Sequence, residues 1–229
     1  MRQVLFLSFI AVCGFFISGS VAAEDTYTEE VTIIAEVADL AGAGTVISNE
    51  DLQKAMDTDI QKILTAVPGL YMRTEEGYGL RPNISIRGTA IERSAKVTIM
   101  EDGVLVAPSP YTSSSAYYFP TTGRIHAVEV LKGPAVVSQG PQTIGGAINL
   151  ISTPIPEANS GKFVQELGDN GMTRTHAYYG GTQGNLGALI EVHEHSSDGF
   201  DTIANVGGNT GFDKSDLMLK ARYLSLIHI

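Results

Sequence analysis

The sequence predicts an α+β domain, with a small mixed β-sheet and short helices, followed by antiparallel strands. The composition of the 229 residues, with Gly 25, Trp 0 and 7% aromatics, suits a turn-rich β protein better than a helical bundle. Short helical and β-prone segments succeed one another as far as Pro154-Ile155-Pro156. Beyond that point the chain changes to longer β-prone runs, separated by glycine-rich turns such as residues 180–185 and by a longer loop at 196–214. These runs are residues 162–167, 173–179, 187–195 and 215–223.

The first helices are predicted from capping patterns. Ser48 with Asp51 and Thr58 with Gln61 both have the three-residue spacing of a capping box. The second helix must end near residue 67, because Pro68 disfavours helical backbone in the residue before it. Its apolar face is Ile60, Ile63, Leu64 and Val67.

Short strands are predicted after these helices, at residues 70–73 and 83–88. A hairpin follows, with strands at 97–100 and 104–106 joined through Glu101-Asp102-Gly103. Asp-Gly tolerates the positive φ angles that tight hairpin turns require. These segments together predict the mixed sheet.

The central stretch of the chain is residues 125–151. An alternating strand ends at Lys132-Gly133-Pro134, and a second strand opens after Gly145-Gly146. Glycine permits positive φ and proline fixes φ, so the segment between the strands can bend sharply. On spacing alone, an ordinary β-turn-β unit of a secreted domain explains it.

Residues 1–23 have the layout of a secretory signal peptide, with Arg2, an apolar core and small residues before Glu24. Without Arg2 the remaining chain carries 14 basic and 25 acidic side chains, 14 − 25 = −11. This acidic balance argues against nucleic-acid binding. The one cysteine, Cys13, lies in the apolar core, so an exported chain would have no disulfide or CxxC metal site.

The loop at residues 107–122 is long and polar, yet contains Tyr111, Tyr117, Tyr118 and Phe119. Tyrosines with serines and threonines are typical of recognition surfaces. The aromatic side chains could equally anchor the loop. Ligand contact and anchoring both remain open at this point.

Residues 187–195 alternate so that Ala188, Ile190 and Val192 share one face and Leu189, Glu191 and His193 the other. This pattern is typical of a transmembrane barrel strand, although a soluble antiparallel sheet accounts for it as well. His193 and His195 share a face while Glu194 points away, so we interpret them as solvated histidines facing a barrel lumen, not as metal ligands. No catalytic motif is found, and we expect no enzyme activity.

The string VEVLKGP…GPQTIGGAIN, with IRG at 86–88, resembles the plug domain of TonB-dependent outer-membrane receptors. The resemblance spans about residues 31–156. It implies an α+β plug domain followed by the first antiparallel strands of a truncated transmembrane β-barrel. The implied organisation is a signal peptide (1–23), TonB box and linker (24–44), plug (45–156), barrel start (157–223) and LSLIHI (224–229), which we interpret as derived from a sequencing-library adapter.

The resemblance implies import of a ferric chelate, iron dicitrate or a siderophore, across the outer membrane of a Gram-negative bacterium, with no cofactor of its own. The implied partners are TonB, with its inner-membrane energising complex, and outer-membrane lipid. An exported soluble plug-like module for ligand binding or signalling is the alternative. Implied TonB contacts are Glu30, Val31, Thr32, Ile33, Ile34 and Ala35; implied ligand contacts are Arg81, Arg93, Tyr111, Ser113, Ser114, Tyr117 and Tyr118; implied plug–barrel contacts are Arg87, Glu129 and Lys132.

Overall fold

The fold was analysed in a computed structural model. The structure describes residues 43–55, 59–75, 78–106, 118–200, 202–203 and 208–224. Within these residues, none of the helices is both long enough and apolar enough to span a membrane.

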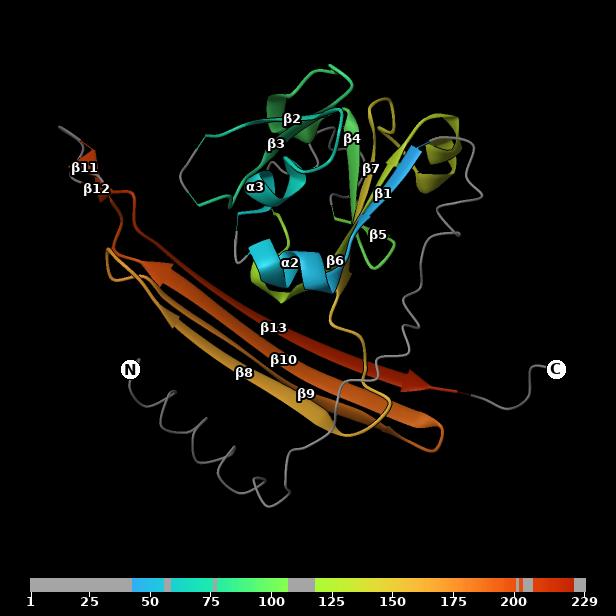
Figure 1. The fold of residues 1–229 in the computed structure, drawn as a ribbon, viewed down its shortest axis with the longest axis vertical. Coiled ribbons are helices and arrows are strands. Elements are labelled where there is room, and N and C mark those ends of the chain that lie inside the picture. Colours follow the sequence, from blue (N-terminus) through green and yellow to red (C-terminus); the bar gives the residue numbers. More distant parts are fainter. Residues whose placement is uncertain are drawn as a thin grey trace. The chain divides into compact units, whose positions relative to one another are not determined.

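The first sheet has five strands in the order β1-β6-β7-β4-β5 (Figure 1). Its strands are β1 (Ala43–Ile47), β6 (Ile125–Lys132), β7 (Gly146–Ser152), β4 (Val97–Glu101) and β5 (Val104–Leu105). β4 pairs with β7 in parallel, and the other neighbours are antiparallel. The predicted mixed sheet is therefore confirmed, and β1 begins two residues before the plug boundary expected at residue 45.

A separate antiparallel pair consists of β2 (Leu70–Arg73) and β3 (Asn83–Ile86). The helices α2 (Asn49–Ala55) and α3 (Ile60–Leu64) come before it in the chain. Both helices occur where the capping patterns predict them. The apolar face predicted for the second helix is buried throughout, which places it in the domain core.

The predicted capping residues are correct for one helix and wrong for the other. At α2 the capping box is confirmed: Asp51 N–H donates to Ser48 Oγ at 3.2 Å and Ser48 N–H donates to Asp51 Oδ2 at 3.2 Å. At α3 the predicted cap is wrong, because Asp59 Oδ1 accepts from Gln61 N–H at 2.8 Å. Thr58 lies outside the described residues. A carboxylate one residue later satisfies the helix N-terminus just as well.

The core contains apolar side chains from α3, from β3 and from strands of the five-stranded sheet, and Leu52 of α2 packs against it partly buried. Every residue of β6 and β7 is buried, so the alternation in β6 does not mark a solvent-exposed face. These two strands are covered on both sides, and Glu129 at the centre of β6 is 1% exposed. The principal core residues are Ile60, Leu64, Ile84, Ile86, Val97, Ile99, Val128, Val130, Ile148 and Leu150.

Three 3-10 turns connect these elements: Glu92–Ser94, Thr122–Arg124 and Pro134–Gln139. The predicted hairpin turn between β4 and β5 is confirmed, with φ of 48° at Asp102 and 77° at Gly103. Asp and Gly both tolerate a positive φ at a tight turn, which is why the Asp102-Gly103 pair predicted the turn correctly.

The second sheet has four antiparallel strands in the order β13-β10-β9-β8. They are β8 (Ser160–Leu167), β9 (Thr173–Gln183), β10 (Leu186–Ser197) and β13 (Phe212–Tyr223), the long strands of Figure 1. All four predicted runs are strands. The turn predicted at residues 180–185 is shorter than expected, because β9 continues to Gln183.

The long predicted loop between β10 and β13 contains a small hairpin, β11 (Thr202–Ile203) with β12 (Gly208–Asn209). As expected from the sequence, the α+β domain is followed by antiparallel strands, and the four strands described here do not close into a barrel.

Candidate functional site

The strands β10 and β13 have the reverse of the burial seen in a soluble sheet. In β10, Glu191 and His193 are 0% and 1% exposed, while Ile190 is 46% exposed. In β13, Leu217 and Leu219 are 62% and 67% exposed. The predicted face assignment in residues 187–195 is confirmed. Polar side chains are thus buried on one face of this sheet, and apolar side chains are exposed on the other.

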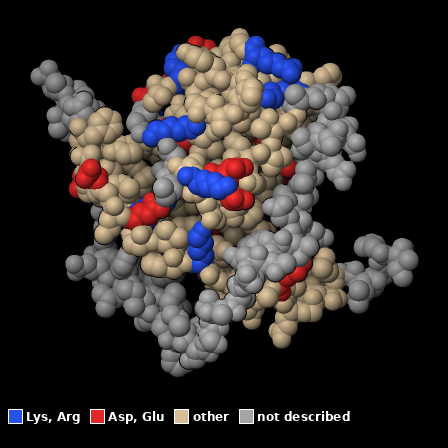
Figure 2. Space-filling model, viewed as in Figure 1, with Lys and Arg blue, Asp and Glu red and all other residues tan. Residues whose placement is uncertain are grey.

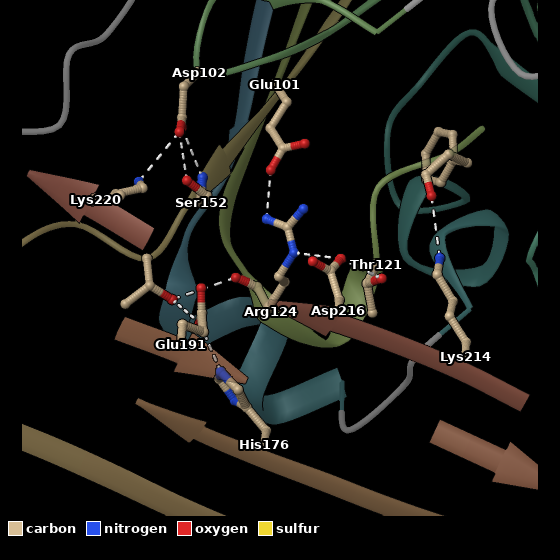
Figure 3. Close-up of polar contacts among 12 residues, drawn as sticks. Glu101, Asp102, Thr121, Arg124, Ser152, His176, Glu191, Lys214, Asp216 and Lys220 are labelled. Atoms are coloured by element: carbon tan, nitrogen blue, oxygen red, sulfur yellow. Dashed lines mark hydrogen bonds and ion pairs between the residues drawn. The ribbon is translucent and has the colours of Figure 1, made fainter. Parts of the chain in front are cut away.

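Arg124, at the end of the turn before β6, lies at the centre of the buried polar contacts (Figure 3). Its guanidinium, 2% exposed, donates from Nη1 to Glu101 and from Nε to Asp216 Oδ2 at 2.9 Å. Thr121 donates to the same Asp216 oxygen at 2.8 Å. Burial disfavours the charged guanidinium, but hydrogen bonds and attraction from the two carboxylates outweigh it and raise the pKa of Arg124. Arg124 therefore stays charged and joins β4 to β13.

Asp102 makes a second connection between the α+β domain and β13. Its carboxylate accepts from Ser152 N–H at 2.9 Å and from the Ser152 hydroxyl, and it pairs with Lys220 Nζ at 3.2 Å. Burial alone would raise the pKa of Asp102, but the hydrogen bonds from Ser152 and the charge of Lys220 lower it below its ordinary value. The hairpin turn is thereby tied both to the end of β7 and to the second sheet.

Further polar contacts join the α+β domain to the second sheet, and one of them is extended by a contact within that sheet. Thr153 donates to Glu191 Oε1 at 2.6 Å, and His176 Nε2 lies 2.7 Å from the same oxygen. Two more contacts complete the set: Lys214 Nζ to the Phe119 carbonyl at 3.1 Å, and Tyr78 hydroxyl to Ser197 hydroxyl at 2.9 Å. We call these contacts, with those of Arg124 and Asp102, the polar interface.

His193 is buried, and neither ring nitrogen has a hydrogen-bond partner among the described residues. A Cβ on Gly123 would overlap its Nε2, so this approach requires glycine. The interpretation of His193 and His195 as solvated is wrong, since they are 1% and 8% exposed. Within the described part of the chain, no three His, Cys, Asp or Glu side chains are grouped to hold a metal ion.

Several predicted contact residues cannot be placed. The predicted TonB contacts, Glu30 to Ala35, and four predicted ligand contacts, Tyr111, Ser113, Ser114 and Tyr117, lie outside the described residues. Arg81 and Arg93 are exposed on the segments that flank β3.

Tyr118, also a predicted ligand contact, lies in a different environment and is 48% exposed. Burial, and next the negative charge of Glu101, raise the pKa of the Tyr118 phenol. Tyr118 therefore lies near carboxylates of the polar interface. In the sequence it is well separated from Arg81 and Arg93.

The predicted plug–barrel residues have described contacts within the α+β domain. Glu129 Oε2 accepts from Asn149 Nδ2 at 2.9 Å. Lys132 Nζ donates to the Pro68 carbonyl at 2.9 Å, and burial, with the nearby charge of Arg87, lowers its pKa. Arg87 is exposed, with φ of 53°. Contacts of these three residues with a barrel wall stay a prediction.

Sequence reasoning missed the residues that form the polar interface. Arg124 has partners 23 and 92 residues away, and no local pattern indicates them. A signal was present in β13, where Lys214, Asp216 and Lys220 alternate with Leu217 and Leu219. Figure 2 shows basic and acidic side chains interspersed on this face, with no large patch of one sign.

Comparison with known proteins identifies the domain. Residues 36–147 match the family model described as the TonB-dependent receptor plug domain. The ferric citrate transporter FecA in its unliganded form is 25% identical with a TM-score of 0.64, and the match covers 82% of this chain and 29% of FecA.

Two further solved structures show the same fold. The ferric yersiniabactin uptake receptor FyuA from Yersinia pestis is 22% identical with a TM-score of 0.65, over 82% of this chain and 29% of that one. The siderophore receptor PirA from Acinetobacter baumannii is 20% identical with a TM-score of 0.61, over 80% of this chain and 29% of that one. The chain thus spans less than a third of the length of each solved receptor. Residues 36–147 of this chain are therefore identified as a TonB-dependent receptor plug domain.

Proposed function

We propose that this chain is the plug and the first wall strands of an outer-membrane receptor that imports a ferric chelate, iron dicitrate or a siderophore, into the periplasm. TonB, energised from the inner membrane, would drive movement of the plug. In this proposal residues 1–23 are the signal peptide, 24–44 the TonB box and linker, 45–156 the plug and 157–223 the first part of the barrel.

The observation that carries the proposal is the inverted burial of β10 and β13. A sheet with Leu217 and Leu219 exposed and Glu191 buried is unfavourable in water, because exposed apolar side chains gain nothing there. The same sheet is favourable where hydrocarbon meets the apolar face and a polar domain meets the other. The polar interface supplies that second contact.

The ligand class follows from the side chains proposed to contact it. Arg81 and Arg93 are exposed cations, and guanidinium groups bind carboxylates in a bidentate manner. A ferric chelate with free carboxylates, such as iron dicitrate, is therefore our first candidate. The serines and tyrosines at 111, 113, 114, 117 and 118 would add hydrogen bonds and ring contacts.

The TonB contact is proposed for residues 30–35. A β-prone segment on a flexible tether can add as a strand to the edge of a partner's sheet, where backbone hydrogen bonds supply the affinity. A proline inside the segment removes a backbone donor and should block the pairing.

The test uses the complete reading frame of the source gene, expressed in an outer membrane that lacks other ferric citrate receptors. Uptake of radioactive iron supplied as ferric dicitrate is measured with and without TonB. Ile33→Pro should abolish uptake while leaving surface binding of the chelate unchanged. Thr26→Pro, upstream of the proposed contact, is the matched control and should retain uptake.

Surface binding of the chelate in every variant, together with TonB-dependent uptake that fails only in Ile33→Pro, would support the proposal. Uptake that continues without TonB would contradict the coupling. If the complete reading frame yields an exported protein that does not enter the membrane, the transport proposal is refuted and a soluble plug-like module becomes the better description.

A further inference from the structure

A strained turn presents one of the exposed arginines. In the 3-10 turn Glu92–Ser94, Arg93 has φ 51° and ψ 30°, and Ser94 has φ 55°. Left-handed backbone is unfavourable for residues with a Cβ, and two such residues in succession persist only where neighbouring groups enforce them. We therefore asked which side chains hold this turn.

Ser94 is held from two directions. Its hydroxyl donates to the Pro82 carbonyl at 3.1 Å and accepts from Ile84 N–H at 3.0 Å. The residue is 0% exposed, so water does not compete for these hydrogen bonds. The left-handed backbone places the Ser94 side chain in the interior, while the neighbouring Arg93 is exposed.

Asn83, the first residue of β3, holds Arg93 itself. Asn83 Oδ1 accepts from the Arg93 N–H at 2.6 Å, and its Nδ2 donates to the Arg73 carbonyl at 3.4 Å. Asn83 is 1% exposed. One buried amide thus fixes the backbone of Arg93 relative to both strands of the β2–β3 pair.

The charges around the turn leave Arg93 available for an anion. Its neighbour Glu92 pairs with Arg73 at 3.4 Å, and Arg73 also lies 3.5 Å from Glu75. Within the described residues, the Arg93 guanidinium has no recorded hydrogen bond or ion pair, although acidic groups lie close by in the sequence. A cation held at a fixed exposed position without a protein counterion is suited to a ligand that brings the negative charge.

We propose that Asn83 and Ser94 are positioning residues that hold Arg93 as the contact for a carboxylate of an anionic ferric chelate. The inference rests on the proposed function and adds to it the device that sets the geometry of the contact. Neither Asn83 nor Ser94 touches the ligand. Their effect on binding passes through Arg93 alone, which makes the proposal separable from a general effect on folding.

The test is a double-mutant cycle in the complete receptor, with the affinity for ferric dicitrate and the melting temperature measured for each variant. Arg93→Gln should weaken binding roughly 10- to 100-fold, the range for a charged hydrogen bond. Asn83→Ala should weaken it about tenfold or more and reduce its salt dependence, because the guanidinium is no longer held in place. In the Arg93→Gln background, Asn83→Ala should have no further effect on affinity.

Ser85→Ala is the matched control. Ser85 is a buried β3 residue whose hydroxyl donates to the Thr89 carbonyl, so its loss should lower the melting temperature without changing affinity. If the effects of Asn83→Ala and Arg93→Gln multiply, or if Asn83→Ala behaves like Ser85→Ala, the inference is overturned while the proposed function stands. If the unsubstituted receptor binds no ferric chelate, both fall together.

Discussion

Replacing Arg124 by methionine tests the polar interface at its most buried point. The substitution retains much of the side-chain volume but removes the charge shared by Glu101 and Asp216. Loss of one partner from a buried ion pair costs about 3–5 kcal/mol, because the remaining charge is left without compensation. Both carboxylates are 16% exposed, so partial hydration favours the lower end, about 3 kcal/mol.

The assay is urea unfolding of the complete receptor in detergent, followed by far-UV circular dichroism. With a slope of about 2 kcal/mol per molar urea, a loss of about 3 kcal/mol lowers the midpoint by about 1.5 M. Lys54→Gln is the control, since Lys54 and Glu50 form an ion pair on an exposed helix face, where solvent screening leaves little net stabilisation.

A triple variant separates charge from packing. Arg124→Met combined with Glu101→Gln and Asp216→Asn leaves no unpaired charge, so it should recover more than half of the lost stability. If Arg124→Met shifts the midpoint no more than Lys54→Gln does, Arg124 is not a buried charge centre and the reasoning is refuted.

Three other substitutions test separate parts of the fold. Gly146→Ala should cost about 1–3 kcal/mol in thermal unfolding, because its Cβ would lie 2.5 Å from the Leu131 carbonyl; Gly88→Ala, also at positive φ but with open space, should cost less. Asp59→Ala should cost about 1 kcal/mol by removing the cap of α3, while Asp59→Ser should be nearly neutral; equal losses would contradict the cap. Folding lowers the pKa of Asp102, so its carboxylate stabilises the fold above about pH 4, and this stabilisation disappears as the pH falls through the folded-state pKa. Asp102→Asn, which tolerates the same φ, should therefore reduce the loss of stability at acid pH; an unchanged loss would contradict the role of Asp102.

Local signals in the sequence predicted most of the fold. The Asp102-Gly103 turn and the helix after Asp59 depend on interactions within a few residues, and both were found at the expected places. The cap itself was misplaced by one residue, since Thr58 and Asp59 are both good cap residues and the pattern does not choose between them. The alternation in β6 carries less information, because the strand is covered on both sides and Glu129 is buried despite its charge.

The polar interface was not predictable in the same way. Arg124 is one charged residue at the start of an apolar strand, a position usually occupied by a solvated side chain. Its role depends on Asp216, which lies 92 residues later and belongs to the other sheet. Only the alternation in β10 and β13 indicated which face would meet a polar partner. Which plug residues would meet that face depends on the packing of the folded chain.

The chemistry of the polar interface has a consequence for the proposed transport. Apolar contacts resist separation in proportion to the area exposed to water, whereas most hydrogen bonds contribute only about 0.5–1.5 kcal/mol net because water replaces the lost partner. The contacts of Thr153, Lys214 and Tyr78 with the second sheet are of this replaceable kind. Arg124 differs, since at the start of separation its buried charge loses Asp216 before water can hydrate it. Under the proposed function, a plug pulled from the barrel wall would therefore lose the contacts of the polar interface one after another. Breaking the contact of Arg124 with Asp216 would need the largest single force.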